Sequence, residues 1–347
     1  MVVDIMHFDQ EVTYSVPNDK PESDRLDMAH TLVTRLIGNK LFLAPLVGGI
    51  GHRILDIGTG TEACEMGKVF QNAELRQSVM PEARKDTNAK RTRSWETTRA
   101  PSNRASAYPS SLFQSFTWLT LRTRGPLNVR FEADDVEDSW AGHNKYEYIM
   151  CRYMAAAIRD WPKLVKNIYE QVFSHGLFTS FHAAEYQDMD IELYSDNGSP
   201  TEKHATKEWS KTFVTTLRNI GLDPAPGPQL EGWLRGHGGF NNNFHQKFKA
   251  PVGPWPKDKH LKDLGMPNLV QTVDGLEGSR SGCFPGCWGV QRKRSRSSLL
   301  ACDRSSRAMH FIAGLTCVSL LVAILMERHT CHVVYGQKPL VSDVHEP

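Results

Sequence analysis

A short stretch of the chain, Arg53–Thr61 with the sequence RILDIGTGT, combines an acid and two glycines in a spacing that suits nucleoside binding. Its first five residues resemble the end of a buried strand that carries Asp56. Gly58, Thr59 and Gly60 then turn the chain, because glycine permits positive φ and lets a ligand approach the backbone. A strand that ends this way and enters a helix predicts an adenosine-bearing cofactor at the carboxyl edge of a parallel sheet. An ordinary tight turn is the alternative.

The alternation of strands and helices around this stretch predicts an open α/β sheet. The helical pattern begins at Asp24, and a second helix should follow the glycine turn at Glu62–Phe70. Apolar residues recur every three or four positions in 160–173, which predicts an amphipathic helix with Pro162 in its first turn. Further strands are expected at 128–133, 145–154, 176–187, 245–255 and 332–339, and further helices at 202–222, 230–234 and 260–278.

The overall composition is that of an ordinary soluble globular protein. The 347 residues are 40% hydrophobic and 23% charged, enough for one large domain or two small ones. The formal net charge of +2 gives no general attraction to nucleic acid or anionic membranes. We therefore expect no nucleic-acid partner.

The cysteines favour a reducing compartment and no metal site. All seven are scattered without CxxC spacing, and no histidine pair follows them at zinc-finger distance. The N-terminus, MVVDIMHFDQ, lacks the pattern of a secretory signal. These features predict a cytoplasmic or nuclear protein.

Two long blocks interrupt the regular pattern. Residues 76–125 are rich in Arg, Lys, Ser and Thr with little periodicity, which predicts a disordered insertion. Residues 279–330 form an atypical segment with turn residues and a basic run. An arm that binds RNA or an acidic partner is the alternative for the first block. Phe311–Met326 has sixteen residues without a charge, short of the ~20 that cross a bilayer, so a buried helix is preferred to a membrane anchor. The remaining divisions are a flexible N-terminus at 1–23, a main domain at 24–278, and a terminal strand with a tail at 331–347.

Several strings together resemble the fungal LaeA-like methyltransferases. They cover roughly residues 10–75 and 126–278 and the last dozen, and they are DRLDMAH, GNKLFLAP, RILDIGTGT, NVRFEADDVEDSW, CRYMAAAIRDWPKL, ELYSDNGS, PVGPWPKDKHLKDLG and HVVYGQKP. The resemblance implies a Rossmann-like class I methyltransferase sheet with helices on both faces and an N-terminal helical extension. It also implies S-adenosylmethionine as the methyl donor.

The resemblance assigns roles to individual positions. Asp56 and the glycine turn, Gly58–Gly60 with Thr59 between them, would approach the methionine and ribose portions of the donor. Asp135 would accept from the adenine amino group, and the Val136 amide would meet a ring nitrogen. A solvated acidic loop is the alternative for residues 134–138.

The chain also departs from the family pattern. Glu62 stands where the family has a third glycine, and Val79 stands where an acid usually binds the ribose hydroxyls, with Glu82 as the nearest substitute. The irregular blocks have no family counterpart, and retained introns or frameshifted exons in the gene model would explain them.

The acceptor side is less defined by sequence. Candidate general bases are His182, Glu185 and His30, and Arg152 and Tyr153 are candidate groups lining the substrate cleft. The leading prediction is methylation of a small molecule in secondary metabolism. The alternatives are a regulator that acts through protein partners in the nucleus, and an inactive homologue.

Overall fold

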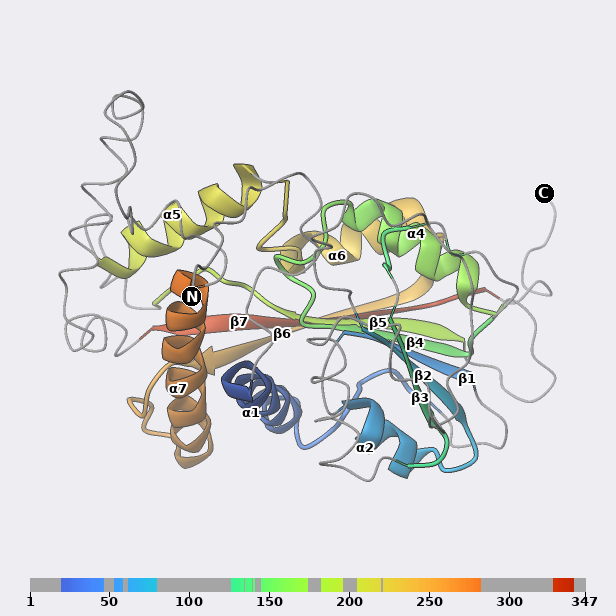
Figure 1. Cartoon of the computed structure of the whole chain (residues 1–347), viewed down its shortest axis with the longest axis horizontal. Coiled ribbons are helices and arrows are strands. Elements are labelled where there is room, and N and C mark those ends of the chain that lie inside the picture. Colours follow the sequence, from blue (N-terminus) through green and yellow to red (C-terminus); the bar gives the residue numbers. More distant parts are fainter. Residues whose placement is uncertain are drawn as a thin grey trace, which may run out of the picture.

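The computed structural model describes the chain at residues 20–46, 53–58, 62–79, 126–133, 135–138, 140, 145–173, 182–195, 205–219, 221–281 and 327–339. A seven-stranded sheet forms its centre (Figure 1). The strands are β1 (Arg53–Ile57), β2 (Glu74–Val79), β3 (Val129–Ala133), β4 (Tyr148–Arg152), β5 (Ala183–Met189), β6 (Asn241–Pro251) and β7 (Arg328–Gln337). Their order is β3-β2-β1-β4-β5-β7-β6, and β7 runs antiparallel to both of its neighbours.

Helices cover both faces of the sheet. They are α1 (Lys20–Leu36), α2 (Glu62–Val69), α4 (Trp161–Gln171), α5 (Ala205–Asn219), α6 (Gly227–Trp233), the π-helix η1 (Leu234–Gly238) and α7 (Lys259–Ser281). In Figure 1, α4, α5 and α6 lie on one side of the sheet, and α1, α2 and α7 lie on the other. This is the Rossmann-like α/β arrangement that the sequence predicts, including the N-terminal helical extension, which begins at Lys20 rather than Asp24.

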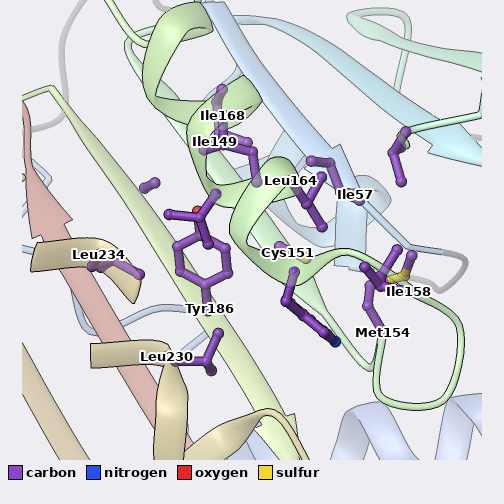
Figure 2. Close-up of a cluster of buried hydrophobic side chains, with 14 of the residues drawn as sticks. Ile57, Ile149, Cys151, Met154, Ile158, Leu164, Ile168, Tyr186, Leu230 and Leu234 are labelled. Carbon is purple, nitrogen blue, oxygen red and sulfur yellow. The ribbon is translucent and has the colours of Figure 1, made fainter. Parts of the chain in front are cut away.

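The largest apolar cluster lies between the sheet and the α4–α6 layer. Figure 2 shows Ile57, Ile149 and Tyr186 from the central strands facing side chains from α4, α6 and the loop after β4. Pro162 occupies the first turn of α4, and the Asp160 side chain caps the helix by accepting from the Lys163 N–H at 3.0 Å. The apolar stripe of α4 is therefore buried as its spacing predicts.

Two further clusters fill the opposite face. Met66 and Phe70 pack against the strands under α2. Leu32 and Val33 of α1 and Leu264 of α7 pack against β5 and β7. The α1 helix is thereby seated at the side of the sheet where β4 and β5 end.

The structure corrects the boundaries expected for the irregular blocks. Residues 76–79 do not belong to an insertion, because they complete β2: residues 76–78 pair with 55–57 of β1, and residues 76–79 pair with 130–133 of β3. Helix α7 extends to Ser281, and β7 begins at Arg328, which pairs with Pro251 of β6. Both ends of the block placed at 279–330 are therefore ordered, because its last residues complete the sheet.

The apolar run Phe311–Met326 lies outside the described residues, and so does the greater part of both irregular blocks. Across the described ranges, no helix combines the length and the apolar character needed to cross a membrane.

Candidate functional site

The glycine turn stands where two neighbouring parallel strands end. Residues of β1 and β4 pair in register up to Ile57 and Cys151, so Gly58 lies beside Arg152, the last residue of β4. Gly58 has a φ of +134°, and a Cβ built on it would lie 2.6 Å from the Arg152 carbonyl oxygen. A side chain at this position would both strain the backbone and collide with β4. The sequence prediction that glycine is required here is confirmed for Gly58, while Thr59 and Gly60 lie outside the described residues.

Polar groups of β2 hold the turn from its other side. The Gln77 side-chain amide donates to the Gly58 carbonyl oxygen at 3.1 Å, and the Gly58 N–H donates to the Ser78 carbonyl at 3.4 Å. Asp56 lies directly opposite Gln77 in the ladder and is buried. Sequence reasoning missed Gln77, although a glutamine in a central parallel strand is itself a signal, since such strands are usually apolar throughout.

The acidic loop after β3 is fixed by its own hydrogen bonds. The Asp135 carboxylate accepts from the Glu137 N–H at 3.0 Å, and Asp135 is half-buried. The Val136 side chain is buried in the largest apolar cluster, and its carbonyl accepts from the Trp140 ring N–H at 2.8 Å. These hydrogen bonds fix Asp135 relative to Glu137 and Val136 relative to Trp140.

Glu137 joins this loop to α4. Its carboxylate accepts from the Arg159 N–H at 2.8 Å and from the Asp160 N–H at 2.9 Å. The acid is therefore structural, because it satisfies donors at the start of the helix. Asp138 in the same loop is exposed.

Three side chains in contact connect β4 to α1 and α2. They are Arg152 of β4, His30 of α1 and Glu65 of α2. Arg152 Nη1 lies 2.8 Å from His30 Nδ1, and His30 Nε2 lies 3.1 Å from a carboxylate oxygen of Glu65 in α2. Because arginine can only donate, His30 Nδ1 accepts and the proton of the neutral ring sits on Nε2, facing Glu65. Both ring nitrogens of His30 are thus committed, which leaves His30 unsuited to remove a proton from an acceptor. Glu65 was missed by sequence reasoning, which has no means of pairing it with a helix 35 positions away.

Arg152 and Tyr153 also bind the segment that contains α1. A second Arg152 nitrogen donates to the Leu41 carbonyl at 2.8 Å, and the Tyr153 hydroxyl donates to the Ala29 carbonyl at 3.0 Å. Tyr153 has a left-handed φ of +55°, an uncommon backbone state for a non-glycine residue. Both residues lie at the predicted edge, and their polar atoms hold α1 over it.

The strained loop after β4 rests on a buried acid that the sequence did not single out. Asp188 accepts from the Met154 N–H at 2.9 Å and the Ala155 N–H at 2.8 Å, and its other oxygen accepts from the Met189 N–H at 2.9 Å. Burial raises the pKa of Asp188 to about 7, while these three N–H groups oppose the shift. Asp188 therefore positions the loop that borders the glycine turn.

Glu185 stands inside the protein and acts as a structural acceptor. It is fully buried in β5, and it receives bonds from the N–H groups of Leu43 and Ala44 at 2.7–3.0 Å and from the Tyr148 hydroxyl at 3.1 Å. Burial raises the pKa of Glu185, and the same donors oppose the shift. The candidacy of Glu185 as a general base is therefore not supported, because its acceptor positions are already occupied by the chain.

His182 lies at the wrong end of the sheet for a general base. It directly precedes β5, whereas the glycine turn and Arg152 lie at the carboxyl ends of parallel strands. It is fully buried, and its carbonyl accepts from the Lys338 N–H at 2.8 Å. The strand expected at 176–187 begins at Ala183, so His182 lies at the amino end of β5. This is the edge of the sheet opposite the glycine turn.

No group of three or more His, Cys, Asp and Glu side chains that could hold a metal ion occurs in the described part of the chain. The edge around Gly58 therefore brings together the ends of β1 and β4, the buried Asp56 and the Asp188-supported loop after β4.

Comparison with known proteins agrees with this geometry. Residues 28–238 match the family model of a methyltransferase domain. The chain is 34% identical over 274 residues to methyltransferase pytC of Aspergillus terreus, covering 78% of this chain and 71% of pytC. It is 24% identical over 262 residues to the secondary metabolism regulator LAE1 of Pyricularia oryzae, covering 73% of this chain and 66% of LAE1.

Among solved structures, the chain is similar to Haemonchus contortus phosphoethanolamine N-methyltransferase 2 in complex with S-adenosyl-L-methionine. The identity is 14% and the TM-score is 0.44, with 89% of this chain and 51% of that chain covered. The chain thus spans about half of that protein, and a TM-score below one half supports no conclusion about this one.

Proposed function

Since the chain belongs to the methyltransferase-domain family and is an S-adenosylmethionine-dependent enzyme, we propose that it methylates a small molecule of secondary metabolism. The observation that best supports a methyl-donor site is the close approach of the Gly58 backbone to the end of β4. There a glycine with positive φ is required, and an ordered acidic loop follows β3 of the same sheet.

The residues present are compatible with the methyl donor. Asp56 and the turn from Gly58 through Thr59 to Gly60 would receive its methionine and ribose portions, because backbone can approach a ligand closely only where Cβ atoms are absent. The Asp135 carboxylate accepts hydrogen bonds and would take the adenine amino group, with the Val136 amide donating to a ring nitrogen. The cofactor supplies a methyl group already made electrophilic by the sulfonium.

The chain's own part in the reaction is placement. Bringing two reactants into the right geometry removes an entropic barrier worth up to about 7–11 kcal/mol. Asp188 fixes the loop after β4, and Arg152 with Tyr153 fixes α1 over the same edge. We propose that Arg152 and Tyr153 contribute to the wall of the acceptor cleft through these contacts.

Asp135→Asn should weaken donor binding without disturbing the loop. The remaining amide oxygen can still accept from the Glu137 N–H, but the carboxylate that accepts from adenine is lost. We expect the Kd of S-adenosylhomocysteine to rise about tenfold, the value of one charge-assisted hydrogen bond. Calorimetric titration measures it, and the exposed Asp138→Asn in the same loop is the matched control. Equal affinities of the two variants would show that Asp135 does not contact the adenine.

Val79→Glu should strengthen donor binding. Val79 is the last residue of β2, where a carboxylate would meet the ribose hydroxyls. We expect the Kd for S-adenosylhomocysteine to fall about tenfold, since hydrogen bonds to charged groups contribute about 1.5–3 kcal/mol. Val69→Glu adds the same charge at an exposed position of α2 and should leave the Kd unchanged. A Val79→Glu protein that binds no more tightly than Val69→Glu would mean that the ribose lies elsewhere or that Glu82 already serves it.

Similarity to LAE1 supports a second candidate, a regulator that acts through protein partners in the nucleus. Incubation with methyl-labelled S-adenosylmethionine and a fungal cell extract, followed by ultrafiltration and cation-exchange removal of the unreacted donor from the filtrate, separates the two candidates. Label in the small-molecule fraction supports the cytoplasmic metabolic enzyme, and label in protein supports the regulator. The Gly58→Asp variant, which should not bind the donor, is the blank.

A further inference from the structure

Four ionisable side chains form a continuous hydrogen-bonded row at the α6 face of the sheet, which we call the histidine bridge. A Glu231 oxygen lies 3.1 Å from His245 Nδ1, and His245 Nε2 lies 2.9 Å from His332 Nδ1. His332 Nε2 lies 3.1 Å from Asp190 Oδ2. The four residues come from α6, β6, β7 and the segment directly after β5, so the bridge joins four parts of the fold.

The number of bonds fixes the number of protons. Three hydrogen bonds need three protons, whereas two neutral imidazoles carry two and an ionised carboxylate carries none. Arg235 lies 2.7 Å from the other Glu231 oxygen, so this carboxylate has an arginine partner as well as His245. The complete bridge therefore contains one proton more than its neutral rings supply, and its four groups share a net charge of −1.

The bridge would lose one hydrogen bond without the extra proton, and it would also lose one if a second proton were added. With both rings charged, His245 Nε2 and His332 Nδ1 would both be donors and would face each other at 2.9 Å. Burial lowers the pKa of His245, with the Glu231 carboxylate opposing the shift and the nearby His332 and Lys247 adding to it. The bridge is thus complete with one extra proton and incomplete with none or with two.

We propose that the histidine bridge is a pH-sensitive hydrogen-bonded contact that holds α6 on the sheet through one shared proton. The contact that it secures is close, because a Cβ at Gly227, the first residue of α6, would lie 2.5 Å from the His332 ring. The loop before α6 in turn bonds to the loop after β4, with the Ala156 N–H donating to the Asp223 carbonyl at 2.9 Å. The histidine bridge therefore supports the loop after β4, which borders the proposed methyl-transfer site.

The other charged groups near the bridge come from each packed element. They are Arg235 on η1, Lys247 on β6, Asp188 on β5 and His329 on β7. The His329 Nδ1–H donates to the Asp190 carbonyl, and burial lowers the pKa of His329 to about 4, so this ring stays neutral where the bridge changes. Asp188 titrates in the same range, since its pKa is raised to about 7 with a contribution from Asp190, and it is present in both the wild type and His245→Gln.

The sign of the pH effect follows from proton counts. In the unfolded chain the two rings together hold one extra proton at about pH 6.5, more below and fewer above. Stability rises with pH wherever the unfolded state binds more protons, and falls where the native state binds more. The complete native bridge holds one extra proton both below and above about pH 6.5. Its contribution to stability is therefore expected to be largest near that pH and to decrease at lower and at higher pH.

The test is the melting temperature of the full chain against pH for the wild type, His245→Gln and the control His260→Gln. His245 is half-buried, so the variant should fold, and His260 is exposed on α7. We expect the wild type to exceed His245→Gln by about 3–6 °C near pH 6.5, and by less than half of that at about pH 5 and about pH 8.5. His260→Gln should follow the wild type throughout. A difference that is flat or changes in one direction over this range overturns the proposal.

A second measurement does not depend on any variant's folding. Nitrogen chemical shifts of labelled histidine rings in the wild type distinguish neutral from doubly protonated imidazole. Near neutral pH we expect one doubly protonated ring and one neutral ring in the bridge. Two neutral rings, or two rings that take up protons together, would contradict the shared proton.

Discussion

Gly58→Ala is expected to slow methyl transfer about a hundredfold and to destabilise the fold by about 2–4 kcal/mol. The added Cβ would lie 2.6 Å from the Arg152 carbonyl oxygen, and alanine disfavours the φ of +134° that Gly58 adopts. The ends of β1 and β4 would have to separate. A displacement of about 1 Å at such a site costs on the order of a hundredfold in rate. Urea unfolding measures the first effect, and transfer of labelled methyl groups measures the second.

Two other glycines provide matched controls for this substitution. Gly232 lies in α6 with nothing within 4 Å of a Cβ, so Gly232→Ala should be neutral or stabilising by up to about 1 kcal/mol. A Cβ at Gly265 would overlap the Gly253 carbonyl oxygen in a part of the fold away from the glycine turn, so Gly265→Ala should destabilise without weakening donor affinity in the folded fraction. If Gly58→Ala is as stable and as active as Gly232→Ala, the geometry described for the turn is incorrect.

Glu185→Ala is expected to cost about 3–5 kcal/mol of folding stability, enough to unfold a marginal domain. The change removes the shared acceptor for the Leu43 and Ala44 N–H groups and for the Tyr148 hydroxyl, all of which are held in the interior. Buried donors without a partner are costly. Denaturant unfolding measures the loss, and the exposed Glu170→Ala on α4 should change stability by less than about 0.5 kcal/mol.

Glu185→Gln separates a structural role from a catalytic one. The amide keeps one acceptor oxygen, so we expect an intermediate loss of stability and normal methyl transfer per folded molecule. A Glu185→Gln protein with wild-type stability and no turnover would restore Glu185 as the general base.

The parts of this fold that the sequence predicts well depend on local patterns. Three elements can be read from their own hydrophobic periodicity and from the residues that end them. They are the strand before Gly58, the amphipathic helix that contains Pro162 and the strand after Asn128. The glycine requirement was also readable, since positive φ and close backbone approach are properties of a single position.

The parts that the sequence did not predict depend on contacts between distant segments. His182 was near a strand end, but only the strand's direction in the sheet shows that it is the wrong end. His30 was a reasonable base until Arg152 and Glu65, 122 and 35 positions away, were seen to bind both of its ring nitrogens. The histidine bridge likewise joins residues up to 142 positions apart, and no local pattern connects them.

The central claim is that the edge of the sheet around Gly58 and Asp135 binds the methyl donor. Calorimetric titration of the purified full chain with S-adenosylmethionine and S-adenosylhomocysteine tests it most directly. We expect saturable binding of one equivalent of either ligand with a Kd in the micromolar range, about −8 kcal/mol, and a loss of that binding in Gly58→Asp. No measurable binding at millimolar ligand by a protein that is shown to be folded would contradict the claim and identify the chain as an inactive homologue.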